Sequence, residues 1–193
     1  MPKLFDDHNF IARLRTKTLG RDFRYYRCVT STQNVVRNCI AQNAREGLLV
    51  LGEEQTAGRG QFSRPFFSPP LSGLWFSLLL KPNINTACQV TRLAMQALSR
   101  TVLNLCRVNL ELKEPNDLLW QGEKVAGVLA EGCTRRDVMK YVVLGIGVNV
   151  NTRVEDFPPA LMATSLKIIT NTELSREDLL ADFLVRFEQL YKN

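Results

Sequence analysis

LLVLGEEQTAGRGQFSRPFFSPPLSGLWFSLLL, residues 48–80, places an apolar run on each side of a long polar loop. The first run, Leu48–Leu51, has the length and composition of a short buried strand. The second run, Gly73–Leu80, is typical of another strand, which Lys81 and Pro82 end. The sequence therefore predicts two strands joined by a loop rich in glycine and arginine.

The loop between these strands carries residue types that bind anions. Gly58 and Gly60 can adopt positive φ, which turns backbone N–H groups toward a phosphate oxygen. Arg59 and Arg64 add guanidinium groups, whose forked donors match phosphate or carboxylate. We therefore expect the loop to hold an anionic ligand, and the rest of the chain must indicate which one.

Hydrophobic spacing predicts the remaining elements. Helices are expected from Ser31, as N-cap, to Gly47, then over 86–105 and 175–190, where Ser175 opens a capping pattern. Strands are expected at 23–29, 108–112, 118–120, 124–130 and 138–150, with hairpin turns at 121–122 and 134–137. Because helices flank this central group of strands, we predict an α+β fold: a central mixed, mostly antiparallel sheet with helices against one face. A parallel doubly wound sheet is disfavoured.

Composition and length limit the classes of protein. At 193 residues the chain fits one domain with a self-sufficient core, and no apolar run approaches the ~20 residues of a membrane helix. Its five cysteines include no C-x-x-C pair, which disfavours zinc or a disulfide framework and favours a cytoplasmic location. The net charge of +6 suits anionic ligands, and no nucleic-acid motif accompanies it. His8, the single histidine, has no serine or cysteine motif nearby and predicts no catalytic triad.

A second polar segment indicates a nucleotide. Lys113 and Lys124 can neutralise a phosphate or carboxylate, while Asn116 and Asp117 can order Mg²⁺ or ribose oxygens. Gly127 lets a ligand lie against bare strand backbone. The same residues also fit an ordinary surface turn with two solvated lysines, and the segment alone does not separate these interpretations.

Four segments together resemble the biotin protein ligases, in the right order and at plausible separations: 31–34, 52–81, 113–131 and 143–150. The resemblance implies the class II aminoacyl-tRNA synthetase-like, biotin/lipoate ligase fold, in a single catalytic domain over residues 1–193. It implies a biotin-[acetyl-CoA carboxylase] ligase, in which ATP and Mg²⁺ activate biotin as biotinyl-5′-adenylate with release of pyrophosphate. A lysine of a biotin carboxyl carrier protein domain then attacks the adenylate. Two alternatives stay open: a lipoate ligase or octanoyltransferase of the same fold, and a non-catalytic module that binds biotin or the carrier.

The resemblance also implies roles for residues of this chain. Lys124, the first catalytic candidate, matches a lysine that contacts both the biotin carboxylate and the α-phosphate, and Arg59 joins it from the loop over the adenylate. The biotin head group is assigned to Ser31, Thr32, Gln33 and Gln55, with Trp75 as a wall of its pocket or as a core residue. The remaining ligand contacts are Gly58, Gly60, Arg64, Lys113 and Gly127 for the carboxylate and phosphates, Asn149 for the nucleotide, and Asn116 with Asp117 for ATP and Mg²⁺.

This chain departs from the family pattern in the loop that covers the adenylate. Gln61 stands in place of an arginine, Ser63 of a glycine and Phe66 of a tryptophan. Losing one guanidinium removes about 1.5–3 kcal/mol of charged hydrogen bonding, so we expect faster release of the adenylate. An off-rate that a Gln61→Arg change leaves unaltered would contradict this expectation. Glu114 likewise replaces a tryptophan beside the nucleotide segment.

The length of the chain sets expectations for partners. The catalytic segment begins near the N-terminus, which leaves no room for a helix-turn-helix domain, so we expect no DNA partner. The chain ends soon after the helix predicted over 175–190, where many relatives continue into a small β-barrel domain. Relatives dimerise by pairing of edge strands, which makes a homodimer the assembly to test, and no membrane association is expected.

Overall fold

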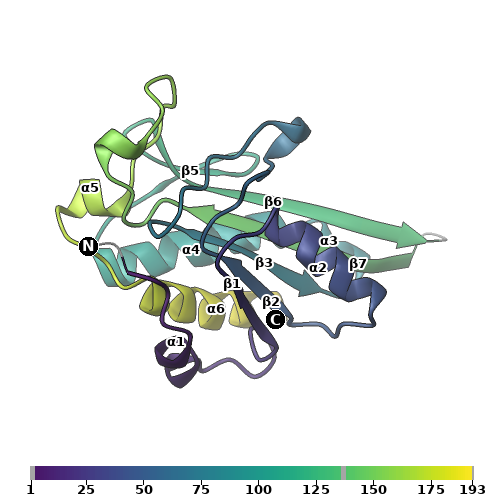
Figure 1. The fold of residues 1–193 in the computed structure, drawn as a ribbon. Helices are drawn as coiled ribbons and strands as arrows, with labels where there is room; N and C mark the ends of the chain where they lie inside the picture. Colours follow the sequence, from purple (N-terminus) through teal and green to yellow (C-terminus); the bar gives the residue numbers. More distant parts are fainter. Residues whose placement is uncertain (1–2, 136–137, 193) are drawn as a thin grey trace.

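A seven-stranded sheet forms the centre of the computed structural model, which describes residues 3–135 and 138–192 (Figure 1). Its strand order is β1-β2-β3-β7-β6-β5-β4, and only the pair β1 and β2 is parallel within these described residues. The strands are β1 (Phe23–Tyr26), β2 (Leu49–Gly52), β3 (Leu74–Leu80), β4 (Glu111–Lys113), β5 (Asp117–Trp120), β6 (Glu123–Arg135) and β7 (Val138–Val148). The prediction of a mixed, mostly antiparallel sheet is confirmed.

The helices are α1 (Asp7–Arg13), α2 (Thr32–Ala41), α3 (Ile84–Ala87), α4 (Val90–Cys106), α5 (Leu166–Thr170) and α6 (Arg176–Lys192), with single 3₁₀ turns η1 (Gln61–Ser63) and η2 (Val154–Asp156). The strands predicted over 23–29 and 108–112 are shorter or shifted, at Phe23–Tyr26 and Glu111–Lys113. Two predicted helix boundaries are also wrong. The helix after Ser31 ends at Ala41, because Asn43, at φ 63°, leaves the helical conformation; Gly47, at φ 93°, belongs to the turn into β2. The helix predicted over 86–105 is divided, since Gln89 at φ −103° and ψ −10° interrupts it. No helix of the described chain is both long and apolar enough to cross a membrane.

Turn chemistry sets the sharp hairpin between β5 and β6. Gln121 and Gly122 have φ values of 50° and 84°, the left-handed conformations that a tight hairpin requires. The predicted turn there is confirmed. The turn predicted at 134–137 includes residues 136 and 137, which lie outside the described residues, and β6 and β7 pair up to Arg135 and Val138.

The two faces of the sheet differ because neighbouring positions of a strand point to opposite sides. On the face that we call the helical face, Phe76, Leu78, Leu144 and Ile146 are buried in one core with α4 and α6. Phe76 contacts Phe183 of α6 edge to face, with ring centroids 5.5 Å apart. In Figure 1, α4 and α6 run side by side along the sheet. This apolar layer is the main core of the domain.

Helix α2 covers part of the opposite face, which corrects the expectation that helices pack against one face only. Val36 and Cys39 of α2 form a separate small core with Val50, Leu79 and Val143 of the sheet. These strand residues alternate with those of the main core, as a pleated sheet requires. The small core therefore anchors α2, whose first turn reaches the site described below.

Farther along the strands, this second face changes from bulky to small residues, namely Ser77, Gly127, Gly145 and Gly147. Gly145 is aligned with Ser77, and Gly147 with Gly127, on neighbouring strands. We call this part of the sheet the cavity face. The long loop over residues 53–73 and the segment 149–165 rise on the same side of the sheet (Figure 1). Missing side chains and flanking loops together leave a hollow.

Candidate functional site

A cavity of about 330 Å³ opens over the cavity face. Its lining residues come from the start of α2 with its N-cap, from the long loop, and from strands β3 to β7. Those that the sequence predicted as site residues are Ser31, Thr32, Gln33, Gln55, Arg59, Gly60, Arg64, Lys113, Asn116, Asp117, Lys124 and Gly127, and Gln61, Phe66, Glu114, Gly145 and Gly147 also line it. Three predicted residues, Gly58, Trp75 and Asn149, lie behind this wall. The fold thus brings segments far apart in the sequence to one concave surface.

Glycines form the floor of the cavity, and a side chain of the wall lies against each of them. A Cβ atom on Gly147 would stand 2.3 Å from the ring of Phe66, and one on Gly145 would stand 3.0 Å from the amide of Gln33. A Cβ on Gly127 would meet Nζ of Lys124 at 3.0 Å. Sequence reasoning missed Gly145 and Gly147, although alternate glycines inside a strand are a signal for close approach to the backbone.

Lys124 and Asp117 form the charged centre of the site. Lys124 Nζ lies 2.6 Å from Asp117 Oδ1, and both side chains are about one-third to one-quarter exposed, at 31% and 26%. The Asp117 Oδ1 atom itself is buried, and within the described residues the Lys124 ammonium is its ion-pair partner. The ammonium also lies 5.9 Å from the centroid of the Phe66 ring. A cationic side chain is thus held at the floor, where it can bind an anion.

The backbone of Lys124 is fixed by the segment after β7. Its N–H donates to Met162 O at 3.1 Å, and its carbonyl accepts from Thr164 N at 3.0 Å. The Asn149 amide donates to the same Lys124 carbonyl at 3.2 Å and to Thr164 O at 3.0 Å. Asn149 was predicted as a nucleotide contact. Because its side-chain amide bonds two backbone carbonyls, it holds the backbone of Lys124 in place and does not line the cavity.

A chain of hydroxyl and amide groups forms the other end of the cavity. Thr32 Oγ1 lies 2.8 Å from Ser77 Oγ, and Gln55 Oε1 accepts from Thr32 N at 2.9 Å and from Thr32 Oγ1 at 3.2 Å. The Gln33 amide donates to Leu129 O at 3.3 Å. Ser31 stands at the N-cap position of α2 but makes no side-chain cap bond. This end can therefore bind a compact polar head group.

The backbone of the glycine and arginine loop is folded on itself. Phe66 N donates to Gly58 O at 2.9 Å, and Gly60 N donates to Arg64 O at 2.8 Å. The prediction that Gly58 and Gly60 adopt positive φ is wrong, since the positive φ of this turn, 56°, belongs to Phe62. Gly58 is needed for space instead, because a Cβ there would stand 3.0 Å from Phe66 O and 3.1 Å from Gln55.

The two loop arginines are exposed at the cavity mouth. Arg59 donates to Asn34 Oδ1 at 2.6 Å, and Arg37 donates to the same oxygen at 3.1 Å. Arg37 also pairs with Glu131. Arg64 lies over the ring of Phe62, 5.9 Å from its centroid. The arginine side chains thus carry the positive charge of the loop to the mouth. The Gly60 backbone N–H does not point at a ligand, because it donates to Arg64 O within the loop.

Trp75 supports the wall rather than forming it. Its side chain is fully buried, and its ring N–H donates to Pro69 O at 2.9 Å. Its ring meets Phe66 edge to face, with centroids 5.8 Å apart. Of the two interpretations that the sequence left open, this placement favours the core role, and Phe66 presents the aromatic surface to the cavity.

The nucleotide segment offers one carboxylate and one amide as metal ligands. The Asn116 side-chain amide N–H donates to Val128 O at 3.1 Å, which leaves the Asn116 side-chain oxygen outside that bond. Asp117, the next residue, supplies the carboxylate. No cluster of three or more histidine, cysteine, aspartate or glutamate side chains that could hold a metal occurs among residues 3–135 and 138–192. The set fits Mg²⁺, which in nucleotide sites is held by one or two carboxylates together with substrate phosphates and water.

Comparison with known proteins agrees with this geometry. The model of the biotin/lipoate A/B protein ligase family matches residues 25–149. The chain belongs to this family. The bifunctional ligase/repressor BirA of Bacillus subtilis is 35% identical over 184 residues, covering 93% of this chain and 57% of that protein. The biotin-[acetyl-CoA-carboxylase] ligase of Mycobacterium tuberculosis is 30% identical over 157 residues, covering 76% of this chain and 56% of that protein.

Solved structures of biotin/lipoate ligases share the fold. The biotin protein ligase from Aquifex aeolicus in complex with biotin and ATP superposes with a TM-score of 0.75 at 30% identity, covering 89% of this chain and 71% of that one. The predicted biotin/lipoate ligase fold is therefore confirmed. The chain spans little more than half the length of the two relatives named above, at 57% and 56%.

Proposed function

We propose that this chain is a biotin protein ligase, which uses ATP to convert biotin to biotinyl-5′-adenylate and transfers biotin to a lysine of a carrier protein. In the first step a biotin carboxylate oxygen bonds to the α-phosphorus as its bond to the pyrophosphate oxygen breaks. In the second step the lysine amine bonds to the acyl carbon, loses a proton, and AMP leaves. The structure of the Aquifex aeolicus relative with biotin and ATP supports this choice of ligands.

The observation that carries the proposal is the position of Lys124. Its ammonium lies against the Gly127 backbone at the floor and pairs with Asp117, in the cavity that Thr32 and Gln55 also line. A carboxylate and a triphosphate repel each other, so a fixed cation between them lowers the cost of bringing them together. A compact ammonium suits two oxygens from different groups better than a planar guanidinium does.

The two ends of the cavity divide the ligands between them. We assign the biotin head group to Ser31, Thr32, Gln33 and Gln55, whose hydroxyl and amide groups form the polar end, with Phe66 beside the bicyclic ring. An aromatic ring and the bare glycine floor suit an apolar bicycle. A volume of about 330 Å³ holds a ligand of that size, while the nucleotide extends toward the open end.

The open end carries the residues that we assign to ATP. We assign Lys113 and Arg64 to the phosphates and Arg59 to the reacting carboxylate, and Asn116 and Asp117 would hold Mg²⁺. When bound, Mg²⁺ neutralises charge on the triphosphate. Asp117 also orients Lys124 in the absence of ligand, since the two groups lie 2.6 Å apart. If Asp117 held Mg²⁺, Lys124 would lose this partner and its ammonium could bind the biotin carboxylate.

A transfer assay with this 193-residue chain tests the proposal. The chain, biotin, ATP and Mg²⁺ are incubated with a purified biotin carboxyl carrier domain, and the carrier mass is measured. We expect the mass of one biotinyl group to be added, and no addition when ATP is omitted. Calorimetry measures the binding of biotin, lipoate and octanoate to the same protein, and so distinguishes a biotin ligase from a lipoate ligase or octanoyltransferase. Binding of lipoate or octanoate with no binding of biotin would overturn the proposal.

A further inference from the structure

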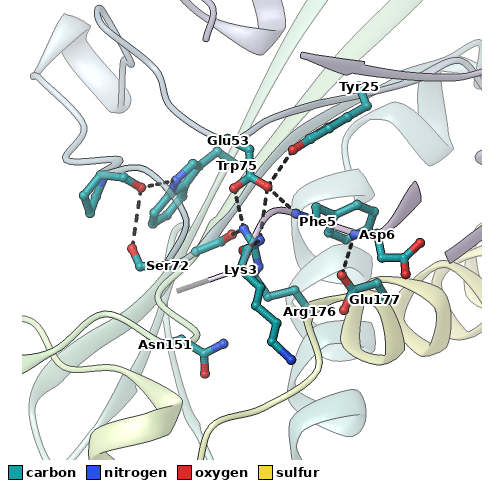
Figure 2. A network of polar contacts seen from close by, with 12 residues as sticks. Lys3, Phe5, Asp6, Tyr25, Glu53, Ser72, Trp75, Asn151, Arg176 and Glu177 are labelled. Carbon is teal, nitrogen blue, oxygen red and sulfur yellow. Dashed lines mark hydrogen bonds and ion pairs between the residues drawn. The ribbon is translucent and has the colours of Figure 1, made fainter. Parts of the chain in front are cut away.

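Opposite the cavity, on the helical face, lies a buried ion pair that the ligand chemistry does not use. Arg176, the first residue of α6, donates from Nη1 to Glu53 Oε2 at 2.7 Å and from Nη2 to Glu53 Oε1 at 3.1 Å. Both side chains are almost completely buried, at 6% and 2% exposure. Figure 2 shows the two groups facing each other at the centre of a polar network. The partners stand 123 residues apart in the sequence.

Arg176 reaches both ends of the loop that walls the cavity. Glu53 follows the last residue of β2, and Gly73 precedes the first residue of β3. Besides its two bonds to Glu53, the guanidinium donates from Nη1 to Gly73 O at 3.1 Å and from Nη2 to Lys3 O at 2.7 Å. One side chain thus joins the start of the loop, its end and the N-terminal segment.

Glu53 gathers further contacts at the same point. Its Oε1 accepts from Phe5 N at 2.5 Å and from the Tyr25 hydroxyl at 2.8 Å. Burial raises the pKa of Tyr25, and the hydrogen bond to the Glu53 carboxylate raises it further, so this hydroxyl stays a donor at neutral pH. The carboxylate is therefore fully surrounded by donors, which a buried charge requires.

Stability of the core alone does not explain a buried ion pair between Arg176 and Glu53. Removing two charges from water costs several kcal/mol, and apolar side chains of similar volume often stabilise a core equally well or better. What an ion pair adds is geometry, because the two oxygens and the guanidinium fork fix one mutual orientation. That orientation is transmitted to the cavity over a short path, since Gln55, which binds Thr32, lies two residues after Glu53.

We propose that Arg176 is a positioning residue for the ligand-binding loop: by binding Glu53 and Gly73 O it fixes both ends of the loop from behind the sheet. Fixed ends keep Gln55 on Thr32 and keep the 58–66 turn over the cavity. Loss of Arg176 therefore loosens the loop beyond what the loss of global stability explains. The effect on biotin rests on the proposed function, whereas the effect on loop order does not.

Amide hydrogen exchange measured by mass spectrometry tests the proposal without any ligand. In Arg176→Met, peptides from residues 53–73 are expected to exchange about tenfold faster or more, relative to peptides of α4 in the same protein. Leu180→Ala is the matched control, because Leu180 is on the same helix and fully buried in the main core. It should lower global stability while leaving the ratio of loop to α4 exchange as in the parent.

A double variant separates positioning from stability. Arg176→Met alone leaves the Glu53 charge buried without its cation, whereas Glu53→Met with Arg176→Met removes both charges. The double variant should unfold at a higher temperature than Arg176→Met, because no uncompensated charge remains, yet its loop should exchange as fast. Loop protection that returns together with stability would overturn the proposal. This comparison also decides the matter if the single variant fails to fold.

Ligand kinetics supply the functional arm. With an active parent, Arg176→Met should raise KM for biotin about tenfold and change kcat by less than about threefold, because Lys124, the first catalytic candidate, lies on β6 and outside the loop. Arg176→Lys keeps the charge but loses the fork, and should fall between parent and Arg176→Met in both loop exchange and KM. A kcat loss with unchanged KM would count against positioning. A parent that binds no biotin contradicts the proposed function and leaves the exchange result valid.

Discussion

The same two strands, β3 and β7, supply the most apolar and the most open parts of the molecule. Toward α4 and α6 they present Phe76, Leu144 and Ile146, all buried in the main core. On the cavity face the neighbouring positions Gly145 and Gly147 carry no side chain. Alternation along a strand therefore assigns stability to one face and ligand space to the other. Substitutions on the two faces should have separable effects.

The largest expected effect is on the chemistry of the cavity face. Lys124→Ala removes the cation between the two anionic ligands, so biotin-dependent pyrophosphate exchange should fall by about a thousandfold or more. Stability should fall by only about 1–2 kcal/mol, since the ion pair with Asp117 is partly exposed. The control is Lys140→Ala, which makes the same charge change at an exposed position of β7 and should leave the exchange rate unchanged. Retained exchange in Lys124→Ala would remove this lysine from the mechanism.

On the helical face the effect should be on stability alone. Leu144 is fully buried, and Leu144→Ala should lower the free energy of unfolding by about 2–5 kcal/mol through lost packing and a cavity. Urea unfolding followed by fluorescence measures this change. Biotin affinity below the unfolding transition should stay within about threefold of the parent. A large loss of affinity in the folded variant would show that the two faces are not separable.

At Gly145, which follows Leu144 and lies on the cavity face, a substitution should lower biotin affinity and leave stability nearly unchanged. A Cβ on Gly145 would stand 3.0 Å from the amide of Gln33, so Gly145→Ala must displace that side chain in the cavity. Because Gln33 can move, stability should change by less than about 1 kcal/mol. Biotin affinity should fall about tenfold, which corresponds to about 1.4 kcal/mol. Titration calorimetry measures the affinity, and an unaltered value would show that Gln33 does not contact the ligand.

The smallest effect concerns a polar anchor of the helical face. Glu188 of α6 accepts from the backbone N–H groups of Lys17, Thr18 and Leu19 at 2.6, 2.7 and 2.8 Å. Burial alone would raise the pKa of Glu188, but the bonds from Lys17, Leu19 and Thr18 N outweigh it and hold the pKa below its ordinary value. Its stabilisation is thus present above the unfolded-state pKa of about 4.3 and is lost as pH falls through the lower folded value.

Glu188→Gln should therefore cost about 1 kcal/mol of stability near neutral pH. The difference from the parent should shrink as the pH falls below about 4, where the parent carboxylate also becomes protonated. Urea unfolding at a series of pH values measures both curves. Parallel curves across that range would contradict a role for the Glu188 charge.

Much of the fold could be predicted from local pattern. Alternation and turn residues located the strands and the Gln121–Gly122 hairpin, because these features depend on neighbours in the sequence. The end of α2 at Ala41 was not predicted, because Gly47 served as the stop signal whereas Asn43, at φ 63°, already leaves the helix. The break before α4 was not predicted, since apolar spacing continues past it. Covering of the second face by α2 depends on tertiary packing, which periodicity does not report.

The site was predictable in its residue types and less so in its contacts. The sequence named Lys124 and Asp117 but not their ion pair, which requires β5 and β6 to pair with a shifted register after Leu118. It named neither Glu53 nor Arg176, because the partners come from distant segments. Gly58 was predicted for the wrong reason: a close contact, rather than a positive φ, requires a glycine there.

The attachment of the loop at Glu53 and Gly73 has a consequence for protein engineering. Because Arg176 fixes one residue at each end, the residues between them can be exchanged as a cassette without altering the junctions with β2 and β3. Loops of related ligases could then be compared on one constant scaffold, provided that both anchor positions are kept. Differences in ligand release among such chimeras would belong to the exchanged residues themselves.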